Sequence, residues 1–287
     1  MVNQKIIDVF DAYTKKEMDR RQFLEKLAII TGSIAAAYSV LPLLENNYAQ
    51  AQIVPADDSR LTTQTIKYQA EGGEMTAYLA SPKTDGKLPA VLVVHENKGL
   101  NPHIEDVTRR VALEGYLAMA PDALSAAGGS PADPDKAVEL IKQLDMNSTI
   151  RNFVAAAAYL KTHPQSTGKV GVVGFCWGGA MANQLAVHSA DILAAVPYYG
   201  MQPTTEDAGR IKASLLLHYA GIDERINKGI PAYTQALDAH QVPYTMYMYE
   251  GANHAFNNDT NAARYDKQAA ELAWKRTIDF FNAKLKG

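Results

Sequence analysis

The sequence predicts an α/β fold, with a mostly parallel central sheet and helices on both faces. From Thr62 onward, short aliphatic and β-branched runs alternate with longer segments of helical periodicity. Several of these short runs are apolar at every position, as expected for strands that are buried on both faces. Because no repeat, low-complexity block or linker interrupts this part, we expect residues 52–287 to form one domain.

The expected strands and helices follow one another along the chain. Residues 66–70 and 75–80 flank Glu71-Gly72-Gly73 and are typical of an opening hairpin. In the next helical segment, Glu105 stands four residues before Arg109, and Asp106 four before Arg110, so we expect surface ion pairs. The expected buried strands are 90–95, 117–120, 170–174, 194–196, 215–217 and 246–249, and the expected helices are 104–114, 135–144, 148–161, 180–188, 230–240 and 262–283.

Composition restricts the function without defining it. The 287 residues are 47% hydrophobic and 21% charged, as in an ordinary soluble globular protein. The net charge is only −3, and Lys and Arg are scattered, so we expect no nucleic-acid partner. The single cysteine cannot form an intramolecular disulfide or a cysteine-based zinc site, which leaves packing, dimer bridging or chemistry.

The first 51 residues are typical of a leader. The segment 19–26 contains the pair Arg20-Arg21 and precedes a weakly apolar run over 27–44, which indicates an export signal of the twin-arginine type. Ala49-Gln50-Ala51 is a small-x-small pattern, so we expect cleavage after about residue 51, an exported or periplasmic protein, and no stable membrane span afterwards. Asp19 stands where Ser or Thr is usual, Glu25 precedes the expected Lys, and a long polar stretch comes first.

The alternative is an N-terminal segment that remains part of a cytoplasmic protein. Phe10, Tyr13, Phe23 and Leu27 would then form one side of an amphipathic helix that packs on the body or on a second subunit.

The motif around Cys176 indicates a nucleophile. Gly174-Phe175-Cys176-Trp177-Gly178-Gly179 follows an apolar strand and precedes an Ala-rich helix. Such a G-x-C-x-G turn lets a strained backbone expose the side chain at the end of a strand. The helix N-terminus beneath the sulfur also favours a thiolate.

Two further residues complete the pattern. Asp223 follows the strand 215–217, and His254 follows the strand 246–249, so both should lie at the same edge of the sheet. The order nucleophile, acid, histidine is the one expected when these groups stand on successive strand ends. Singly, Asp223 could be a turn former and His254 a packing residue; jointly they indicate a triad with Cys176. His218, His163, His188 and His240 are interpreted as structural.

In this order, Gly-Phe-Cys-Trp-Gly-Gly, Gly-x-Asp and His-Ala-Phe resemble the dienelactone hydrolase family, over about residues 62–284. The resemblance implies an α/β-hydrolase fold and hydrolysis of a lactone or activated ester through an acyl thioester, without cofactor or metal. For Glu96 it implies a carboxylate that hydrogen-bonds the resting thiol and helps to activate it; a loop cap is the alternative. Asn97 and Trp177 would offer backbone N–H groups to an oxyanion hole.

The chain departs from the family where a substrate carboxylate would bind. Arginines are expected after the Pro-Asp pair and after the histidine, but residues 123–128 and 257–259 contain none. Arg225 and Lys98 are candidate substitutes, and Tyr199 is a candidate pocket residue with core packing as its alternative.

The expected partner is a small-molecule ester or lactone, bound by a monomer or homodimer. The competing functions are a general acyl esterase, a dehalogenase-like relative, and a non-catalytic binding or assembly protein on the same fold.

Overall fold

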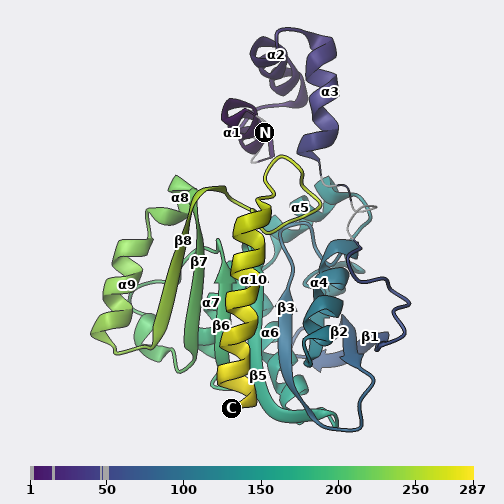
Figure 1. Cartoon of the computed structure of the whole chain (residues 1–287), viewed down its shortest axis with the longest axis vertical. Helices are drawn as coiled ribbons and strands as arrows, with labels where there is room; N and C mark the ends of the chain where they lie inside the picture. Colours follow the sequence, from purple (N-terminus) through teal and green to yellow (C-terminus); the bar gives the residue numbers. More distant parts are fainter. Residues whose placement is uncertain (1–2, 15–16, 46, 48–51) are drawn as a thin grey trace.

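The computed structural model describes residues 3–14, 17–45, 47 and 52–287, and its centre is one eight-stranded sheet (Figure 1). The strand order is β1-β2-β4-β3-β5-β6-β7-β8. The strands are β1 (Leu61–Ala70), β2 (Gly73–Pro82), β3 (Leu88–Val94), β4 (Leu117–Pro121), β5 (Ser166–Phe175), β6 (Ile192–Tyr198), β7 (Ser214–Ile222) and β8 (Tyr244–Asn253). The longer helices are α1 (Gln4–Thr14), α2 (Arg20–Thr31), α3 (Ile34–Leu44), α4 (Pro102–Leu113), α5 (Pro134–Gln143), α6 (Met146–Thr162), α7 (Trp177–His188), α9 (Ile230–Ala239) and α10 (Lys267–Phe281), with a single short turn α8 (Glu224–Asn227).

The predicted α/β fold is confirmed. β1 pairs with β2, and β2 with β4, in antiparallel fashion, and every later pairing in the sheet is parallel. The register aligns Val94 at the end of β3 with Gly174 in β5, and Ile222 of β7 with Asn253 of β8. The carboxyl ends of these strands therefore meet at one edge of the sheet, where α/β folds bind ligands.

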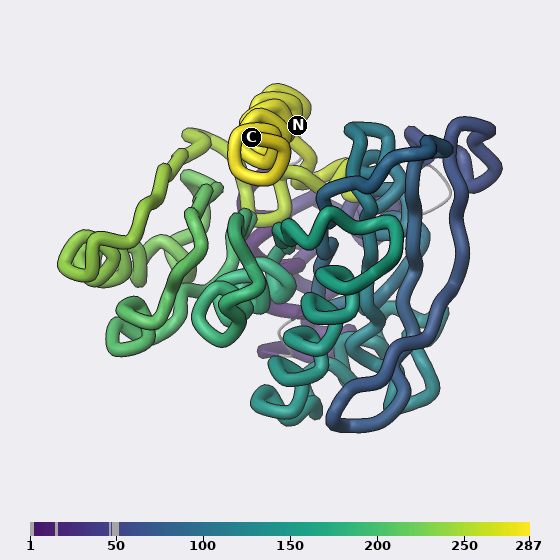
Figure 2. The backbone as a smooth tube through the Cα atoms, turned by 90° about the horizontal axis from the view of Figure 1, so that it is seen from below, coloured from purple at the N-terminus to yellow at the C-terminus, as the bar shows by residue number. Residues whose placement is uncertain are grey.

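Helices cover both faces of the sheet (Figure 2). Successive residues of β3 alternate between two cores: Leu92 packs in the cluster that contains Phe153 of α6, and Val93 packs in the cluster that contains Val107 of α4 and Phe281 of α10. A strand side chain points to the opposite face at each step, so an apolar run over the whole of β3 serves two cores.

Most strands extend beyond their expected ranges, as β8 (Tyr244–Asn253) does, and two of the boundaries have a local explanation. α10 begins at Lys267 rather than at 262, because the side chain of Asp266 caps the helix by accepting the N–H of Ala269. The hairpin turn is shorter than expected, since Gly73 already belongs to β2.

The N-terminal helices α1–α3 form a separate small cluster at the carboxyl edge of the sheet (Figure 1). Phe10, Phe23 and Leu27 are buried together in its core. Asp19 caps α2 with a capping box, and Ser33 caps α3, so both helices have local start signals. The cleavage pattern at residues 49–51 lies outside the described residues.

The helices of the described segments include none that is by itself long and apolar enough to span a membrane. α2 and α3, which are bent by 107° at their break, meet the criterion of length and composition only as a pair.

The expected surface ion pair of Asp106 and Arg110 forms, but the expectation that it lies at the surface is wrong. Asp106 is fully buried, because its carboxylate also accepts the backbone N–H groups of Ile53 and Val54, at 3.4 and 2.8 Å. Arg110 reaches on to Asp259, at 2.6 Å. This network ties the start of the body to α4 and to the loop that follows β8.

Replacing Asp106 by Ala should lower the free energy of unfolding by about 3 kcal/mol, because buried Arg109, which lies 3.7 Å from this carboxylate, and two backbone N–H groups lose their partner. Urea denaturation of the two proteins measures the difference. The matched control is Glu114→Ala at the exposed end of the same helix, where we expect a change of at most about 0.5 kcal/mol. Equal stability of the two variants would contradict this assignment.

Candidate active site

Cys176 stands alone between β5 and α7, in a strained backbone conformation. Its φ of 56° lies in the left-handed region that L-residues rarely adopt. Two glycines make the turn possible: a Cβ on Gly174 would overlap the backbone of Gly178, and a Cβ on Gly178 would overlap the carbonyl of Val94. The chain can therefore leave the sheet and enter the helix within one residue, which leaves the thiol half-buried at the helix N-terminus.

A stacked pair supports this turn from beneath. The rings of Trp177 and His95 lie 5.2 Å apart and nearly parallel, at 9°. Nε2 of His95 accepts the N–H of Ala123 at 3.1 Å, so Nδ1 carries the proton and donates to the carbonyl of Glu96 at 2.6 Å. His95 thus joins the loop after β3 to the loop after β4. The only sequence signal for this role is the position of His95 at the end of an expected strand.

Asp223 and His254 meet at the same edge of the sheet. Asp223 follows β7 directly and His254 follows β8, and Nδ1 of His254 lies 2.6 Å from Oδ2 of Asp223. Asp223 also caps α8, accepting the N–H of Ile226 at 3.4 Å. The carboxylate fixes the orientation of the imidazole and leaves Nε2 available.

The surroundings of His254 favour its protonated form. Burial lowers its pKa, but the charge of Cys176, hydrogen bonds with Asp223 and Cys176, and the charge of Asp223 together raise the pKa to about 10. The histidine is thus coupled to Cys176 on one side and to Asp223 on the other.

Glu96 follows β3 and is 7% exposed. Its Oε2 accepts the side-chain N–H of Asn258 at 2.7 Å, while Oε1 is buried without a hydrogen-bond partner among the described residues. Oδ1 of Asn258 accepts the backbone N–H of Thr260 at 3.1 Å and its hydroxyl at 2.6 Å, which fixes the amide. The sequence showed only that residues 257–259 lack arginine, so it did not identify Asn258 as the partner of Glu96.

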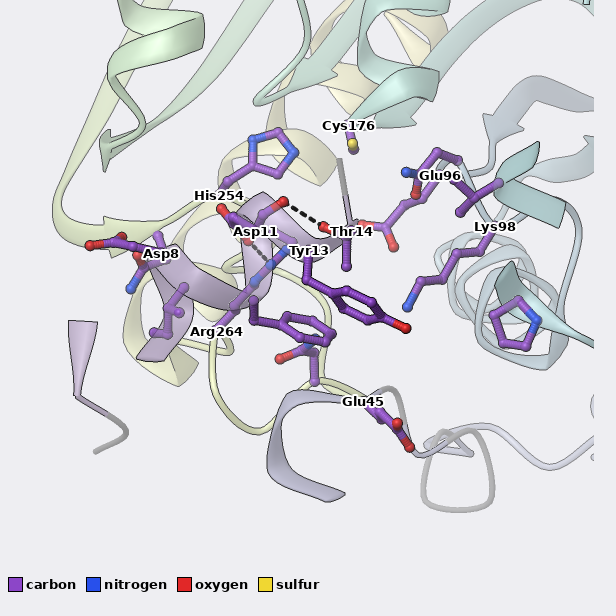
Figure 3. A pocket seen from close by; sticks show the side chains of 18 of the residues that line it. Asp8, Asp11, Tyr13, Thr14, Glu45, Glu96, Lys98, Cys176, His254 and Arg264 are labelled. Atoms are coloured by element: carbon purple, nitrogen blue, oxygen red, sulfur yellow. Dashed lines mark hydrogen bonds and ion pairs between the residues drawn. The ribbon is translucent and has the colours of Figure 1, made fainter. Parts of the chain in front are cut away.

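These groups line one cavity of about 1380 Å³ (Figure 3). Cys176, His254 and Glu96 face it together with Asp223, Asn97, Lys98 and Arg225. Trp177 is the first residue of α7, so its backbone N–H has no acceptor within the helix. The structure therefore brings most of the predicted site residues to one place.

The three tentative substrate-binding residues differ in position. Lys98 is half-buried, and burial lowers the pKa of its ammonium group although the charge of Glu96 raises it. Arg225 is exposed in α8. Tyr199 is only 1% exposed, and its ring centroid lies 5.0 Å from that of His254, so it packs against the histidine. Burial, followed by the charges of Glu96 and Cys176, raises the pKa of Tyr199 far above its ordinary value.

The described part of the chain contains no cluster of three or more His, Cys, Asp or Glu residues suited to a metal ion.

Comparison with known proteins identifies the family of this chain. Residues 75–285 match the model of the dienelactone hydrolase family. A "Putative carboxymethylenebutenolidase" of Escherichia coli (strain K12) is 32% identical over 246 residues, which cover 80% of this chain and 90% of that protein. The crystal structure of a "Putative Dienelactone Hydrolase" from Klebsiella pneumoniae superposes with a TM-score of 0.70 at 30% identity, over 77% of this chain and 98% of that one.

A more distant structure, the esterase rPPE, superposes with a TM-score of 0.65 over 99% of this chain and 98% of its own; at 17% identity this likeness concerns the fold alone. Because the family model spans most of the chain and the relatives match over nearly their whole length, this protein belongs to the dienelactone hydrolase family and is a carboxylic ester hydrolase of the dienelactone hydrolase type.

Proposed function

We propose that Cys176, His254 and Asp223 form a catalytic triad that hydrolyses a small lactone or activated ester through an acyl thioester. One observation carries the proposal: a half-buried thiol at a helix N-terminus shares a cavity with an imidazole that a buried carboxylate holds at 2.6 Å. A positioned nucleophile, a base and an orienting acid are the groups that acyl transfer requires.

In the first half of the reaction, the Cys176 thiolate attacks the carbonyl carbon. The backbone N–H groups of Asn97 and Trp177 stabilise the oxyanion that forms. The raised pKa of His254 makes it an imidazolium at neutral pH. It therefore gives its proton to the departing alkoxide or enolate as the carbon–oxygen bond breaks, which leaves a thioester and a neutral histidine.

In the second half, the neutral His254 accepts a proton from water while the hydroxide attacks the thioester. The carboxylic acid leaves, and the thiolate and the imidazolium are restored, so protons balance over the cycle. Asp223 holds the ring in one tautomer throughout. Because a thiolate is a better leaving group than an amine, the cycle suits activated esters rather than amides.

Glu96 is proposed to assist acylation. Asn258 holds one of its oxygens, and the other is buried without a partner among the described residues beside the same cavity. This free oxygen is available to accept the proton of the resting Cys176 thiol, which leaves the thiolate that attacks, and to return the proton to the sulfur after deacylation. Lys98 and Arg225 line the cavity and are the proposed partners of an anionic part of a substrate, since residues 123–128 and 257–259 supply no arginine.

The two hypotheses for the N-terminal segment remain proposals with opposite consequences. Twin-arginine export with cleavage gives a periplasmic protein that starts after about residue 51. Retention gives a chain in which α1–α3 keep their contacts with the body. N-terminal sequencing of protein purified from each fraction of the native host distinguishes the two.

Replacing Cys176 by Ala should lower kcat/KM for 4-nitrophenyl acetate and for an enol lactone by more than about a thousandfold, since no nucleophile remains. Cys176→Ser, which keeps the shape of the turn, is the matched variant and should be similarly impaired. If Cys176→Ala retained activity within about tenfold, a barrier change of about 1.4 kcal/mol, the triad would be rejected in favour of a non-catalytic role for this residue.

His254 should remain protonated at pH 8 and titrate near its raised pKa of about 10. Its proton therefore stabilises the folded state fully below pH 6.5, the ordinary value, and this contribution disappears as the pH rises through about 10. Ring carbon shifts in NMR, assigned with His254→Gln, follow the titration. The pKa should fall in Cys176→Ala, which removes the charge of the sulfur. A neutral ring at pH 7 in the wild type would contradict the ion pair.

Glu96→Gln should lower the rate of acylation by about a hundredfold, the usual range for a group that takes part in proton transfer, while thermal stability changes little because Asn258 still finds an oxygen acceptor. Single-turnover kinetics measures the acylation step. Glu224→Gln, an exposed acid that lines the same cavity, is the control and should behave as wild type. Equal rates for the two variants would show that Glu96 is only a loop residue.

A further inference from the structure

The cavity at Cys176 has a second wall, which comes from the N-terminal helices. Tyr13 of α1, Leu24 of α2 and Leu41 of α3 are half-buried and line the same cavity as Cys176 and His254. Figure 3 shows Tyr13 reaching into this cavity together with Lys98. This second wall is mixed: apolar side chains such as Tyr13, Leu24 and Leu41 lie beside acidic ones such as Asp8 and Glu45.

Specific contacts hold this wall on the loop that follows β8. Asp11 of α1 forms an ion pair with Arg264, whose guanidinium carbon also lies 5.6 Å from the ring centroid of Phe10. Nε2 of Gln4 donates to Oδ1 of Asn253 at 2.9 Å. The end of α3 is attached as well, because the carbonyl of Leu43 accepts the N–H of Ala263 at 3.1 Å.

The loop at the base of these contacts also carries His254 and Asn258. Ala263 packs into the hydrophobic core of α1–α3, so the loop is shared between the wall and the reacting groups. A change in the position of α1 would consequently move this loop and, with it, His254 and Asn258.

The wall bounds the chamber without filling it. About 1380 Å³ remains with α1–α3 in place, whereas pockets for drug-sized ligands usually hold about 300–1,000 Å³. An acetyl group on Cys176 would occupy a small part of this space. The ring of Tyr13 is held by stacking on Phe23, with centroids 4.6 Å apart and planes at 13°, so it offers a fixed apolar surface.

We propose that Tyr13 is a specificity-determining residue and that α1–α3 form the outer wall of the substrate chamber. Beyond small esters and lactones, the chamber would also take larger, amphipathic ones, with the carbonyl at Cys176 and an aromatic or aliphatic part against Tyr13, Leu24 and Leu41. The inference rests on the proposed hydrolysis at Cys176. It concerns the chain that keeps α1–α3, since cleavage after about residue 51 would remove the wall.

The experiment compares small and large substrates in the full-length protein. kcat and KM are measured for 4-nitrophenyl acetate against 4-nitrophenyl octanoate, and for vinyl acetate against 4-methylumbelliferyl acetate, so that the acyl side and the alcohol side are both tested. Tyr13→Ala should lower kcat/KM for at least one large substrate by about fivefold to tenfold, mainly through KM, because it removes a binding surface and no reacting group. Both small substrates should be unaffected.

Three variants serve as comparisons. Tyr13→Phe keeps the ring and should behave as wild type, and Leu24→Ala should reproduce the effect of Tyr13→Ala from a different helix. Tyr38→Ala makes the same truncation in the same helical cluster, but Tyr38 is 54% exposed and lies outside the lining of this cavity, so it should change nothing. Thermal unfolding of each variant checks that α1–α3 remain folded.

The outcomes separate the two proposals. If the ratios of large to small substrate stay within about twofold of wild type in both Tyr13→Ala and Leu24→Ala, while the acetates are still hydrolysed, this inference is overturned and the proposed function stands. If the wild type hydrolyses none of the four esters, the proposed function fails and this inference fails with it. An equal loss in Tyr38→Ala would also overturn it, because the effect would then come from the cluster as a whole.

Discussion

The left-handed backbone of Cys176 is the constraint on which the site depends. It requires α7 to approach the ends of the sheet so closely that Gly174 and Gly178 have no room for a side chain. This approach places the N-terminus of α7 under the thiol and fixes the position of the sulfur relative to the neighbouring loops. The parallel register of the sheet then brings Glu96, Asp223 and His254 to the same edge. A backbone cost of about 1–3 kcal/mol at one residue is offset by the packing of the surrounding strands.

The loop after β8 connects the reacting groups with the N-terminal helices and with the start of the body. It begins with His254, holds Glu96 through Asn258, and binds α1 through Arg264. Asp259 in the same loop pairs with Arg110, which connects it to buried Asp106 and so to the start of the body. One loop therefore touches the proposed base, the second carboxylate and the wall of the chamber. The proposed reacting groups and the proposed specificity wall therefore lie close together in the structure, although residues 11 and 264 are far apart in sequence.

Local patterns in the sequence predicted the parts of the fold and site that depend on local physics. The apolar runs of the inner strands, the G-x-C-x-G turn, and the placing of Asp223 and His254 after strands are all properties of short segments. The prediction that Asp106 lies at the surface was wrong. Its buried carboxylate accepts backbone N–H groups of residues 53 and 54, which the local pattern of charges does not show. The hydrogen bond between Asn258 and Glu96 joins residues 162 positions apart, and the ion pair between Asp11 and Arg264 joins residues 253 positions apart. Sequence periodicity does not predict contacts over such separations.

Peptide mass spectrometry can show whether acyl transfer passes through the sulfur of Cys176. Wild-type protein is mixed rapidly with a slowly deacylating nitrophenyl ester, quenched in acid and digested. We expect one acyl group per chain, on the peptide that contains Cys176, and none on Cys176→Ala treated identically. Turnover of the ester without any adduct on that peptide, or an adduct at another residue, would rule out the sulfur as the carrier of the acyl group.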